Sequence, residues 1–479
     1  MKKKINSFFN KHRDAFLIVS TIIFELILYA TYPYYEKDYI ILVPCCMLYV
    51  IAIYLILNNR KTWKKNIFYI IYAVGVILRT VYIFKTSIYI RQHDVLGILD
   101  NGHLAYIYNL FATHHLPLTN EWQFYHPPLW HFIGATWLHI NSFFNGSIKY
   151  ALEGIQIFSL LFSSFIMIVV DRICEKIKLS DNNRNLVNIL FAVHPFLILM
   201  SGHINNDILL IFLQMLIILL LFNYHENKSI KNIIYLALAT GFCVMTKMNG
   251  ALMAVPILFV FIKELIDIIK NNKSKIKLFF VKMFIFGFIS LPIGLWYQIR
   301  NLILFSSNKV PPPGDWLYTG DHSIVSRFLT INFNELTNFA KMDYDYNVPA
   351  FLIKSSLFGE YSYENVGVLA LNMVFINTLL IVMSIVFIFL YLKRKKYNTF
   401  MNVLFITWII NVVSIIIYNF EYPYACSMDF RFIGFCLLPG ILFLGYMAPK
   451  IKHRFIVWLM EYSICLFAIM SIIFVFLIK

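Results

Sequence analysis

Long apolar runs, separated by short basic segments, make up most of the 479-residue chain. These runs lack the strict alternation of a half-buried strand, and each is long enough to cross the roughly 30 Å hydrocarbon core of a bilayer as a helix. The pattern therefore predicts an all-α polytopic membrane protein with about 13 transmembrane helices, structured outer-face loops and interfacial helices. The spans are expected at residues 15–35, 39–57, 67–88, 151–172, 184–201, 205–223, 230–247, 249–268, 277–298, 366–392, 398–418, 431–449 and 454–478.

Composition supports this class and removes one alternative. Hydrophobic residues make up 60% of the chain and charged residues 14%, whereas soluble proteins carry about 25% charged residues. The net charge of +16 would suggest a nucleic-acid partner in a soluble protein. Here Lys and Arg concentrate in short loops, as in proteins whose basic loops set their membrane orientation. We therefore expect a lipid environment and no nucleic acid. The seven cysteines lie mostly in apolar runs and form no disulfide framework.

The status of Pro128–Phe144 decides the topology, because this stretch is apolar but short and rich in Trp and His. If it does not cross the membrane, the basic clusters alternate and most of the 41 Lys and Arg residues fall on the inner side. We therefore predict a multi-pass protein of the cell membrane, with the N-terminus inside, the C-terminus outside and Pro128–Phe144 along the outer interface. Met1–Asp14 precedes an apolar run without a small-residue cleavage site, which predicts a retained first span.

Two outer loops divide the chain. In the first, Leu104, Ile107, Tyr108 and Phe111 recur at helical spacing, which fits either a helix on the membrane surface or an ordinary packed helix. The expected parts are two additional N-terminal spans (1–65), a core (66–300) with the first outer loop (86–149), a second outer loop (301–365) and a C-terminal four-span segment (366–479).

Two acids on the predicted outer face are the main candidates for chemistry. Asp94 follows the third span, and Asp207 lies at the tip of a tight helical hairpin. Ionisable residues at the mouth of a span are costly and tend to be functional. Asp207 could instead cap a helix, and Asp94 could pair with Arg91 or Arg79. Glu25, in the middle of the first span, is expected to be a structural partner or a dimer contact.

Histidines and outer cations add two further candidate sites. Seven of the thirteen histidines lie between residues 93 and 139. His126 and His131 could hold a divalent metal, although aromatic-rich interfacial loops also use histidine freely. Lys247, Arg300 and Arg431 are placed on the outer side, where three convergent cations would suit an anionic phosphate. Each could also anchor to lipid phosphate.

The order of these features resembles the GT-C superfamily of polytopic glycosyltransferases, in particular its protein O-mannosyltransferase-like and lipid A aminoarabinose transferase-like bacterial branch. The resemblance covers about residues 65–300, with the last four spans similar in architecture alone. The residues that carry it are His93-Asp94, Gly102-His103-Leu104-Ala105-Tyr106-Ile107, Leu116-Pro117, Tyr125-His126-Pro127-Pro128-Leu129, Asn206-Asp207, Thr246-Lys247-Met248-Asn249-Gly250 and Asp429-Phe430-Arg431.

The resemblance implies roles for individual residues. Asp94 matches the catalytic base of the first outer loop, and Asp207 matches a second acid that shapes the site. Val95 follows Asp94, so the Asp-Glu variant of the motif is absent. His126 stands where some members carry Lys. Lys247, Arg431 and Arg300 become candidates for binding the donor phosphate, and the other substrate-site candidates are His93, His103, Tyr106, His126, His203, Asn206 and Asp429.

The implied reaction is transfer of a hexose or pentose from a polyprenyl-phosphate donor to a glycan, lipid or protein acceptor on the outer face. The leaving phosphate needs no general acid, so one carboxylate base and cations suffice, and direct displacement inverts the anomeric centre. No cofactor is required on this scheme, and a divalent metal remains possible. The alternative is a transporter or flippase of lipid-linked glycans. Transporters place polar groups near the bilayer midplane, whereas these acids lie at the outer boundary.

Overall fold

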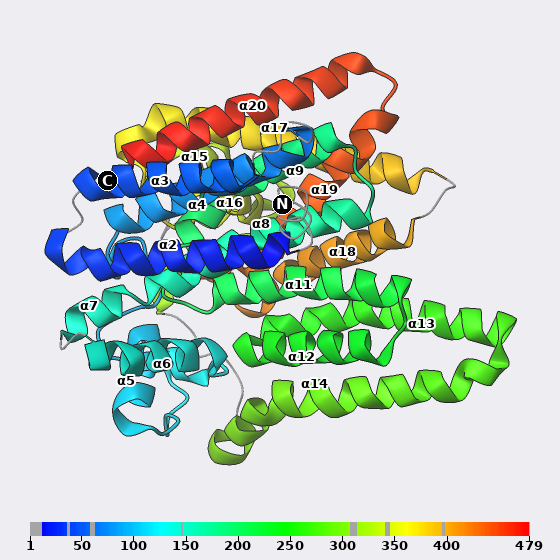
Figure 1. The fold of residues 1–479 in the computed structure, drawn as a ribbon, viewed down its shortest axis with the longest axis horizontal. Helices are drawn as coiled ribbons and strands as arrows, with labels where there is room; N and C mark the ends of the chain where they lie inside the picture. The colour runs from blue at the N-terminus through cyan, green and yellow to red at the C-terminus, as the bar shows by residue number, and fades with distance from the viewer. Residues whose placement is uncertain are drawn as a thin grey trace.

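The structure is a computed structural model that describes residues 12–35, 39–57, 63–144, 147–306, 314–340, 345–394 and 398–478. Helices run side by side through the whole of this part (Figure 1). The one β-bridge among the described residues joins Tyr318 to Tyr424. The predicted all-α class is confirmed.

The helix bounds follow the chain in two sets. The N-terminal half holds α2 (Arg13–Tyr35), α3 (Tyr39–Leu57), α4 (Trp63–Lys85), α5 (His103–Thr113), α6 (Leu129–Phe144), α7 (Ile148–Glu153), α8 (Gln156–Lys176), α9 (Asp181–Val193), α10 (Pro195–Met200), α11 (Asp207–Glu226) and α12 (Ile230–Thr246). The rest holds α13 (Ala254–Asn271), α14 (Ile276–Phe305), α15 (Phe333–Thr337), α16 (Val348–Phe358), α17 (Gly367–Leu392), α18 (Thr399–Glu421), α19 (Leu437–Met447) and α20 (Arg454–Leu477), with short helices η2 (Trp122–Tyr125), η3 (Met248–Met253) and η9 (Phe430–Cys436) among them.

Each predicted span coincides with one or more of these helices, but the predicted count of thirteen is not confirmed. In the described part, eight helical segments are long and apolar enough to cross a membrane. They are Ile67–Lys85, Ile148–Lys176, Asp207–Glu226, Lys273–Phe305, Glu364–Leu392, Thr399–Glu421, Ala425–Lys450 and Arg454–Leu477.

One predicted span, 184–201, is interrupted. It divides into α9 and α10 at His194, and Pro195 is the first residue of α10. Proline lacks a backbone N–H and fits the first turn of a helix but not its interior. The predicted span therefore becomes two helices of 13 and 6 residues.

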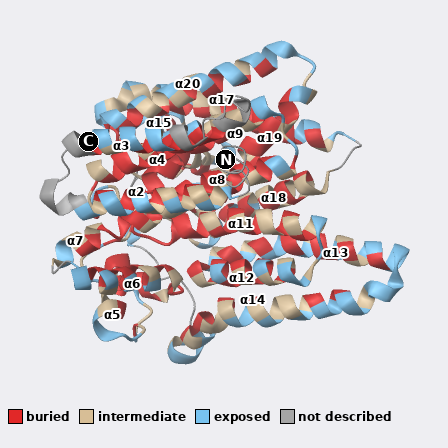
Figure 2. Ribbon diagram, viewed as in Figure 1, coloured by how far each residue is buried: buried red, intermediate tan, exposed pale blue. Residues whose placement is uncertain are grey.

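Burial separates a central group of helices from helices with exposed outer faces (Figure 2). In the most apolar window of α14, 22% of the residues are buried, against 72% in the segment that contains α8. Phe284 and Phe288 on α14 are 69% and 70% exposed. An apolar helix with such an outer face is stable in lipid, where apolar surface carries no cost.

Ion pairs and hydrogen bonds show that the two described chain ends lie at opposite ends of the bundle. Arg13 pairs at 2.8 Å with Asp171, near the last turn of α8. At the other end, the Lys85 ammonium donates a 2.6 Å hydrogen bond to the carbonyl of Phe476 near the end of α20. The helices α5, α6 and α7 lie at the same end as the C-terminus in Figure 1. The first outer loop and the C-terminus therefore share one end, as the predicted topology requires.

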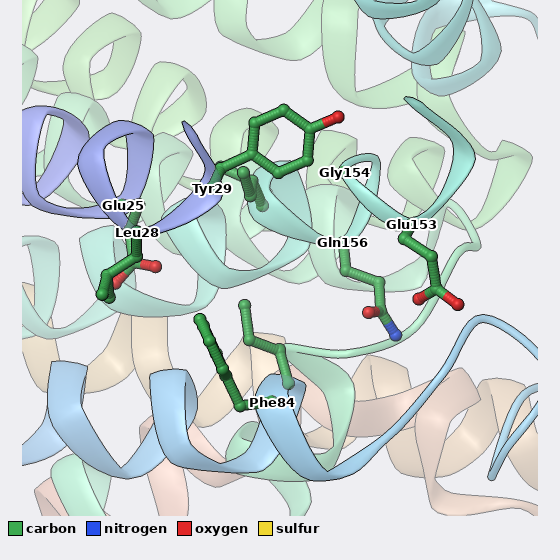
Figure 3. A pocket seen from close by; sticks show the side chains of 9 residues that line it. Glu25, Leu28, Tyr29, Phe84, Glu153, Gly154 and Gln156 are labelled. Atoms are coloured by element: carbon green, nitrogen blue, oxygen red, sulfur yellow. The ribbon is translucent and has the colours of Figure 1, made fainter. Parts of the chain in front are cut away.

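Glu25 is a structural partner within the bundle. Its side chain is buried, and the Thr80 hydroxyl donates a 2.6 Å hydrogen bond to one carboxylate oxygen. A small cavity of about 30 Å³ adjoins Glu25 and reaches Gln156 (Figure 3). That volume is large enough for one water molecule, and Glu25 and Gln156 are polar groups in a lining that is otherwise mostly apolar. Since Glu25 is 1% exposed, the expected dimer contact is wrong and the structural alternative holds.

Candidate functional site

The tips of α11 and α12 bring an acid and a lysine together. Asp207 is the first residue of α11, Lys247 directly follows α12, and the Lys247 ammonium donates a hydrogen bond to the Asp207 carboxylate. The Asn206 amide donates a 3.0 Å hydrogen bond to the carbonyl of Thr246, which ties the two tips together. The N-cap residue of α11 is Asn206. The Asp207 side chain is therefore engaged in an ion pair and does not cap the helix.

Arg431, on η9, lies at the centre of the acids. Its guanidinium nitrogens are 3.8 Å from an oxygen of Asp94, 3.8 Å from an oxygen of Asp207 and 3.5 Å from an oxygen of Asp429. Arg79, a predicted alternative partner of Asp94, instead donates to backbone carbonyls and a serine inside the bundle. The structure thus brings Asp94 and Asp207, 113 positions apart in the sequence, to one buried arginine.

The loop that carries Asp94 has an unusual backbone. Arg91, Asp94 and Leu96 have φ values of 51°, 53° and 52°, a left-handed conformation that is uncommon outside glycine and clusters at functional sites. The carbonyl of Asp94 accepts a 2.9 Å hydrogen bond from the N–H of His103 at the start of α5. A Cβ on Gly102 would lie 2.7 Å from that carbonyl oxygen. The loop is therefore clamped against α5 while the Asp94 side chain stays 38% exposed.

These side chains line one pocket of about 220 Å³. Acids, cations and imidazoles provide its polar surface, and aromatic rings provide most of the rest. The lining residues are Asp94, His103, Trp122, Gln123, Tyr125, His126, Asp207, Lys247, Glu360, Tyr418, Tyr422, Cys426, Ser427, Arg431 and Phe432.

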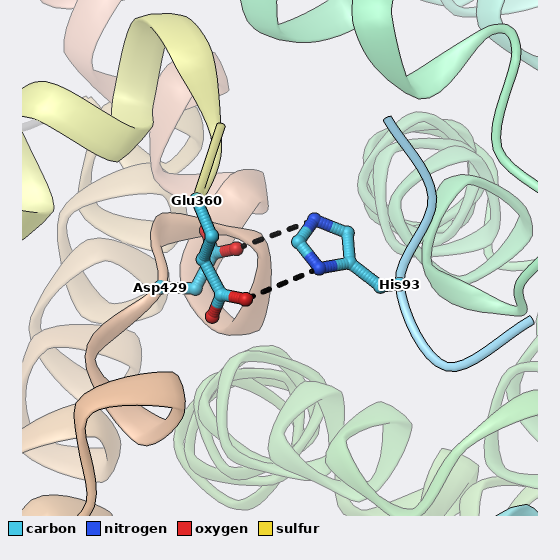
Figure 4. A group of neighbouring side chains, drawn as sticks. All are labelled: His93, Glu360 and Asp429. Atoms are coloured by element: carbon cyan, nitrogen blue, oxygen red, sulfur yellow. Dashed lines mark ion pairs between the residues drawn. The ribbon is translucent and has the colours of Figure 1, made fainter. Parts of the chain in front are cut away.

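His93 joins two further acids at the edge of this pocket (Figure 4). One ring nitrogen lies 3.3 Å from Glu360 and the other lies 3.6 Å from Asp429. Burial acts to raise the pKa of Glu360, but the hydrogen bond and charge of His93, together with Arg431, outweigh it and lower the pKa. The ligand atoms of the three residues lie within 4.8 Å of one another. Among the described residues, this is the group of histidine and acidic side chains that is close enough to hold a metal ion.

The predicted metal ligands His126 and His131 are not in that group. One nitrogen of His131 lies 3.0 Å from a nitrogen of His103, and the rings of His103 and His126 stack at 5.6 Å. Burial lowers the pKa of all three imidazoles, to about 3 for His131. His103 and His126 thus face the pocket as neutral rings. Tyr106 lies behind them, with the His131 ring stacked on it at 3.9 Å and its hydroxyl hydrogen-bonded to Tyr297.

Two other predicted residues, His203 and Arg300, do not line the pocket. One nitrogen of His203 lies 3.2 Å from the hydroxyl of Tyr361, and its ring is 5.1 Å from that of His93, so it supports the site from behind. The Arg300 guanidinium donates a 2.6 Å hydrogen bond to the carbonyl of Pro117 and lies over the Tyr297 ring. Arg300 therefore fastens the first outer loop to α14, and its position gives no support to a phosphate contact.

Glu360 and Trp122 are pocket residues that the sequence analysis missed. Glu360 follows Gly359, which has φ of +62°, in a loop that offers no motif. Its one sequence signal is an acid among aromatic residues of an outer loop. Trp122 is one of many aromatic residues in the first outer loop. The sequence around it does not distinguish a pocket residue from an aromatic anchor at the membrane interface.

Comparisons with known proteins were made for sequence and for structure. Residues 126–296 match the family model described as "Dolichyl-phosphate-mannose-protein mannosyltransferase". A search of functionally characterised protein sequences found no match.

Two solved structures are similar in part. One is the Archaeoglobus fulgidus oligosaccharyltransferase in complex with Zn and sulfate, at 12% identity and a TM-score of 0.42, with 84% of this chain and 52% of that chain covered. The other is apo ArnT from Cupriavidus metallidurans, at 12% identity and a TM-score of 0.36, with 82% of this chain and 76% of that chain covered. The chain thus spans about half the length of the archaeal protein.

The matched segment begins at His126 in the first outer loop and contains Asp207 and Lys247. It leaves out Asp94, which precedes it, and Arg431, which follows it. The match covers 171 of the 479 residues, and over this part the chain is similar to the mannosyltransferase family.

Proposed function

We propose that this protein transfers a sugar from a polyprenyl-phosphate donor to an acceptor hydroxyl on the outer face of the membrane, by inverting displacement. In this reaction the acceptor oxygen loses its proton and forms a bond to the anomeric carbon. The bond from that carbon to the phosphate oxygen breaks, and the phosphate leaves with the electron pair.

Asp94 is the proposed base. It is the most exposed acid of the site, with 38% of its side chain exposed, whereas Glu360, Asp207 and Asp429 are 23%, 2% and 1% exposed. Asp207 is also paired with Lys247, so it holds a cation in place more readily than it accepts a proton. A positioned carboxylate contributes roughly 10²–10⁴-fold to a proton-transfer step.

Lys247 and Arg431 are the proposed contacts of the donor phosphate. Both are nearly buried, and both line the pocket with Asp94. Cations held in a site of low dielectric stabilise a leaving phosphate more strongly than the same charges in water. Asp207 contacts both cations and would therefore set the distance between them.

The charges of the site favour an additional cation. Four carboxylates (Asp94, Asp207, Glu360 and Asp429) surround two permanent cations, Lys247 and Arg431. A divalent metal would offset this excess before an anionic donor binds. His93, Glu360 and Asp429 supply the nitrogen and oxygen ligands that several divalent ions accept. Such an ion would supply Lewis-acid stabilisation of the departing phosphate.

The observation that carries the proposal is the single guanidinium of Arg431 lying 3.8 Å from both Asp94 and Asp207 in one pocket. The same arrangement argues against a transporter or flippase, because Asp207 begins α11, Lys247 directly follows α12 and Asp94 lies beyond the end of α4, so these charges lie at helix ends. Transporters usually bind their substrates near the midplane.

The proposal is tested by mass spectrometry of lipid-linked sugars and envelope glycans from cells with and without the protein. Loss of the protein should cause a polyprenyl-phosphate sugar to accumulate and one glycan modification to disappear. Unchanged lipid-linked sugars and glycans would contradict the proposal. Assays of the purified protein after chelation, with Mg²⁺, Mn²⁺ or Zn²⁺ restored separately, test the metal. Full activity after chelation would show that transfer needs no metal.

A further inference from the structure

Trp122 is placed at the mouth of the pocket. Its side chain is 53% exposed, yet it lines the same cavity as the buried Lys247 and Arg431. The charged groups thus form the floor and the indole forms part of the rim. Tyr422, also half-buried, lines the cavity with it.

The backbone at Trp122 is strained. Its φ of +47° lies in the left-handed region, where a bulky residue is a clear outlier. Hydrogen bonds hold both neighbours: the N–H of Gln123 donates to the carbonyl of Asn101 at 3.1 Å, and the Asn101 amide donates to the Glu121 carboxylate at 3.0 Å. A strained residue persists where the surrounding structure fixes it, and such residues cluster at ligand sites. The backbone from which the indole projects is therefore held in place.

The polar groups beside Trp122 suit hydroxyl groups. Gln123 is 8% exposed and lines the pocket next to the imidazoles of His103 and His126. An amide offers both a donor and an acceptor, which is what vicinal hydroxyls require, and the Nε2 atom of His103 adds one more polar group, because its Nδ1 atom already contacts His131. The 220 Å³ volume is below the roughly 300–1,000 Å³ of pockets for drug-sized ligands and fits a compact ring.

We propose that Trp122 is a stacking platform for a sugar ring of the acceptor, and that the acceptor is a saccharide. The C–H face of a pyranose is apolar and weakly positive, so it packs on the negative face of an indole. The sugar's hydroxyls would meet Gln123, His103 and His126, with one of them directed at Asp94. The inference rests on the proposed function, since it assigns the floor of the pocket to the donor phosphate and the rim to the acceptor. On this assignment the enzyme extends a glycan.

Binding can be tested without turnover. Saturation-transfer difference NMR on the full chain in nanodiscs would use methyl glycosides of glucose, galactose, mannose and N-acetylglucosamine, with a serine- and threonine-containing peptide as the competing class. At least one glycoside should receive saturation through its ring C–H protons. That signal should be lost in Trp122→Ala and kept in Trp122→Phe. Trp316→Ala is the matched control, because Trp316 is 60% exposed on the second outer loop, does not line the pocket and should leave the signal unchanged.

Trp122→Gly separates a binding role from a structural one. Glycine adopts the left-handed conformation without strain, so the melting temperature of this variant should be unchanged or higher while saccharide binding is lost. Once a saccharide acceptor is in use, Trp122→Ala should raise its KM about 3- to 10-fold, the range expected for one aromatic contact, and leave the donor KM unchanged.

Four outcomes overturn the inference: no glycoside binds, the signal survives in Trp122→Gly, the peptide binds in place of the glycosides, or brominated lipid quenches Trp122 while glycosides have no effect. The last outcome would make Trp122 a membrane anchor. Saccharide binding without any transfer from a lipid-phosphate sugar would refute the proposed function but leave the saccharide site at Trp122 standing. Transfer with an unchanged acceptor KM in Trp122→Ala would do the reverse.

Discussion

Replacing Gly102 with alanine should displace the proposed base without removing it. Gly102 has φ of −83° and ψ of −176°, a backbone that any residue can adopt, so glycine is needed there for space alone. An added Cβ would lie 2.3 Å from the carbonyl oxygen of Val95 and 2.7 Å from that of Asp94. Real Cβ contacts are essentially never shorter than 3.0 Å, and both neighbours are backbone. The loop that carries Asp94 must therefore move.

The size of the effect follows from that displacement. A misplacement of roughly 1 Å costs about 10²-fold in a positioned reaction, so turnover by Gly102→Ala should fall about 100-fold. The carbonyls of Asp94 and Val95 also accept hydrogen bonds from His103 and Leu104 at 2.9 and 3.2 Å. Weakening both should lower the free energy of unfolding by about 1–3 kcal/mol.

The assay measures sugar transfer by purified protein in nanodiscs, together with thermal unfolding. Gly367→Ala is the matched control, because a Cβ at Gly367 meets nothing within 4 Å, and it should retain wild-type turnover. Wild-type turnover by Gly102→Ala would refute the argument that α5 fixes the position of Asp94.

Three further predictions concern the cations, the buried ion pair and the topology. Arg431→Ala should raise the donor KM by about one to two orders of magnitude, since a hydrogen bond to a charged group contributes about 1.5–3 kcal/mol. Arg300→Ala should leave the donor KM unchanged. The opposite pattern would place the phosphate site at Arg300 in place of Arg431. Lys247→Ala should weaken donor use, and it should lower the free energy of unfolding by about 3–5 kcal/mol because Asp207 is left unpaired. The double variant Asp207→Asn/Lys247→Met should lose less stability than the two single changes added together. Additive losses would show that the pair is not coupled. In a cysteine-free background, single cysteines at Asn120 and Ser307 should react in intact cells with a membrane-impermeant thiol reagent, and one at Lys395 should not. Ser307 and Lys395 lie outside the described residues. Labelling at Lys395 would reverse the predicted orientation.

Sequence patterns were sufficient for the helices. Apolar runs predicted α3 at residues 39–57 without error, and α12 and α20 to within one residue at each end. The number of crossings was less well determined, because α9, α10 and α12 have 13, 6 and 17 residues and are too short to count among the eight crossing segments. The amphipathic spacing in the first outer loop correctly indicated α5, and the apolar stretch at 128–144 became α6.

The candidate site was predicted in part because its members follow recognisable motifs. Asp94, Asp207, Lys247 and Arg431 were expected on one face, and the structure gathers them in one pocket. Arg300 carried the same sequence signal as Lys247, yet its guanidinium binds the first outer loop. Local sequence shows that a cation ends a span but does not show the direction of its side chain.

Glu360 lay beyond sequence reasoning for a different reason. It reaches His93 through a contact between two outer loops separated by more than 200 residues. Such a contact depends on how α16 and η9 pack, and no periodicity or spacing in the chain encodes it. The metal-ligand group was consequently expected among the histidines of the first outer loop, whereas it forms where that loop meets two later segments.

The most direct test of Asp94 as the general base is the turnover of Asp94→Asn. Asparagine has nearly the shape of aspartate but does not accept the proton, and a positioned base contributes roughly 10²–10⁴-fold. Asp100→Asn is the control, because Asp100 is an exposed acid of the same loop that does not line the pocket. Sugar transfer by Asp94→Asn should fall by 10²–10⁴-fold, while expression, donor binding and the activity of Asp100→Asn remain at wild-type levels. Near-normal turnover by Asp94→Asn would contradict the proposed mechanism.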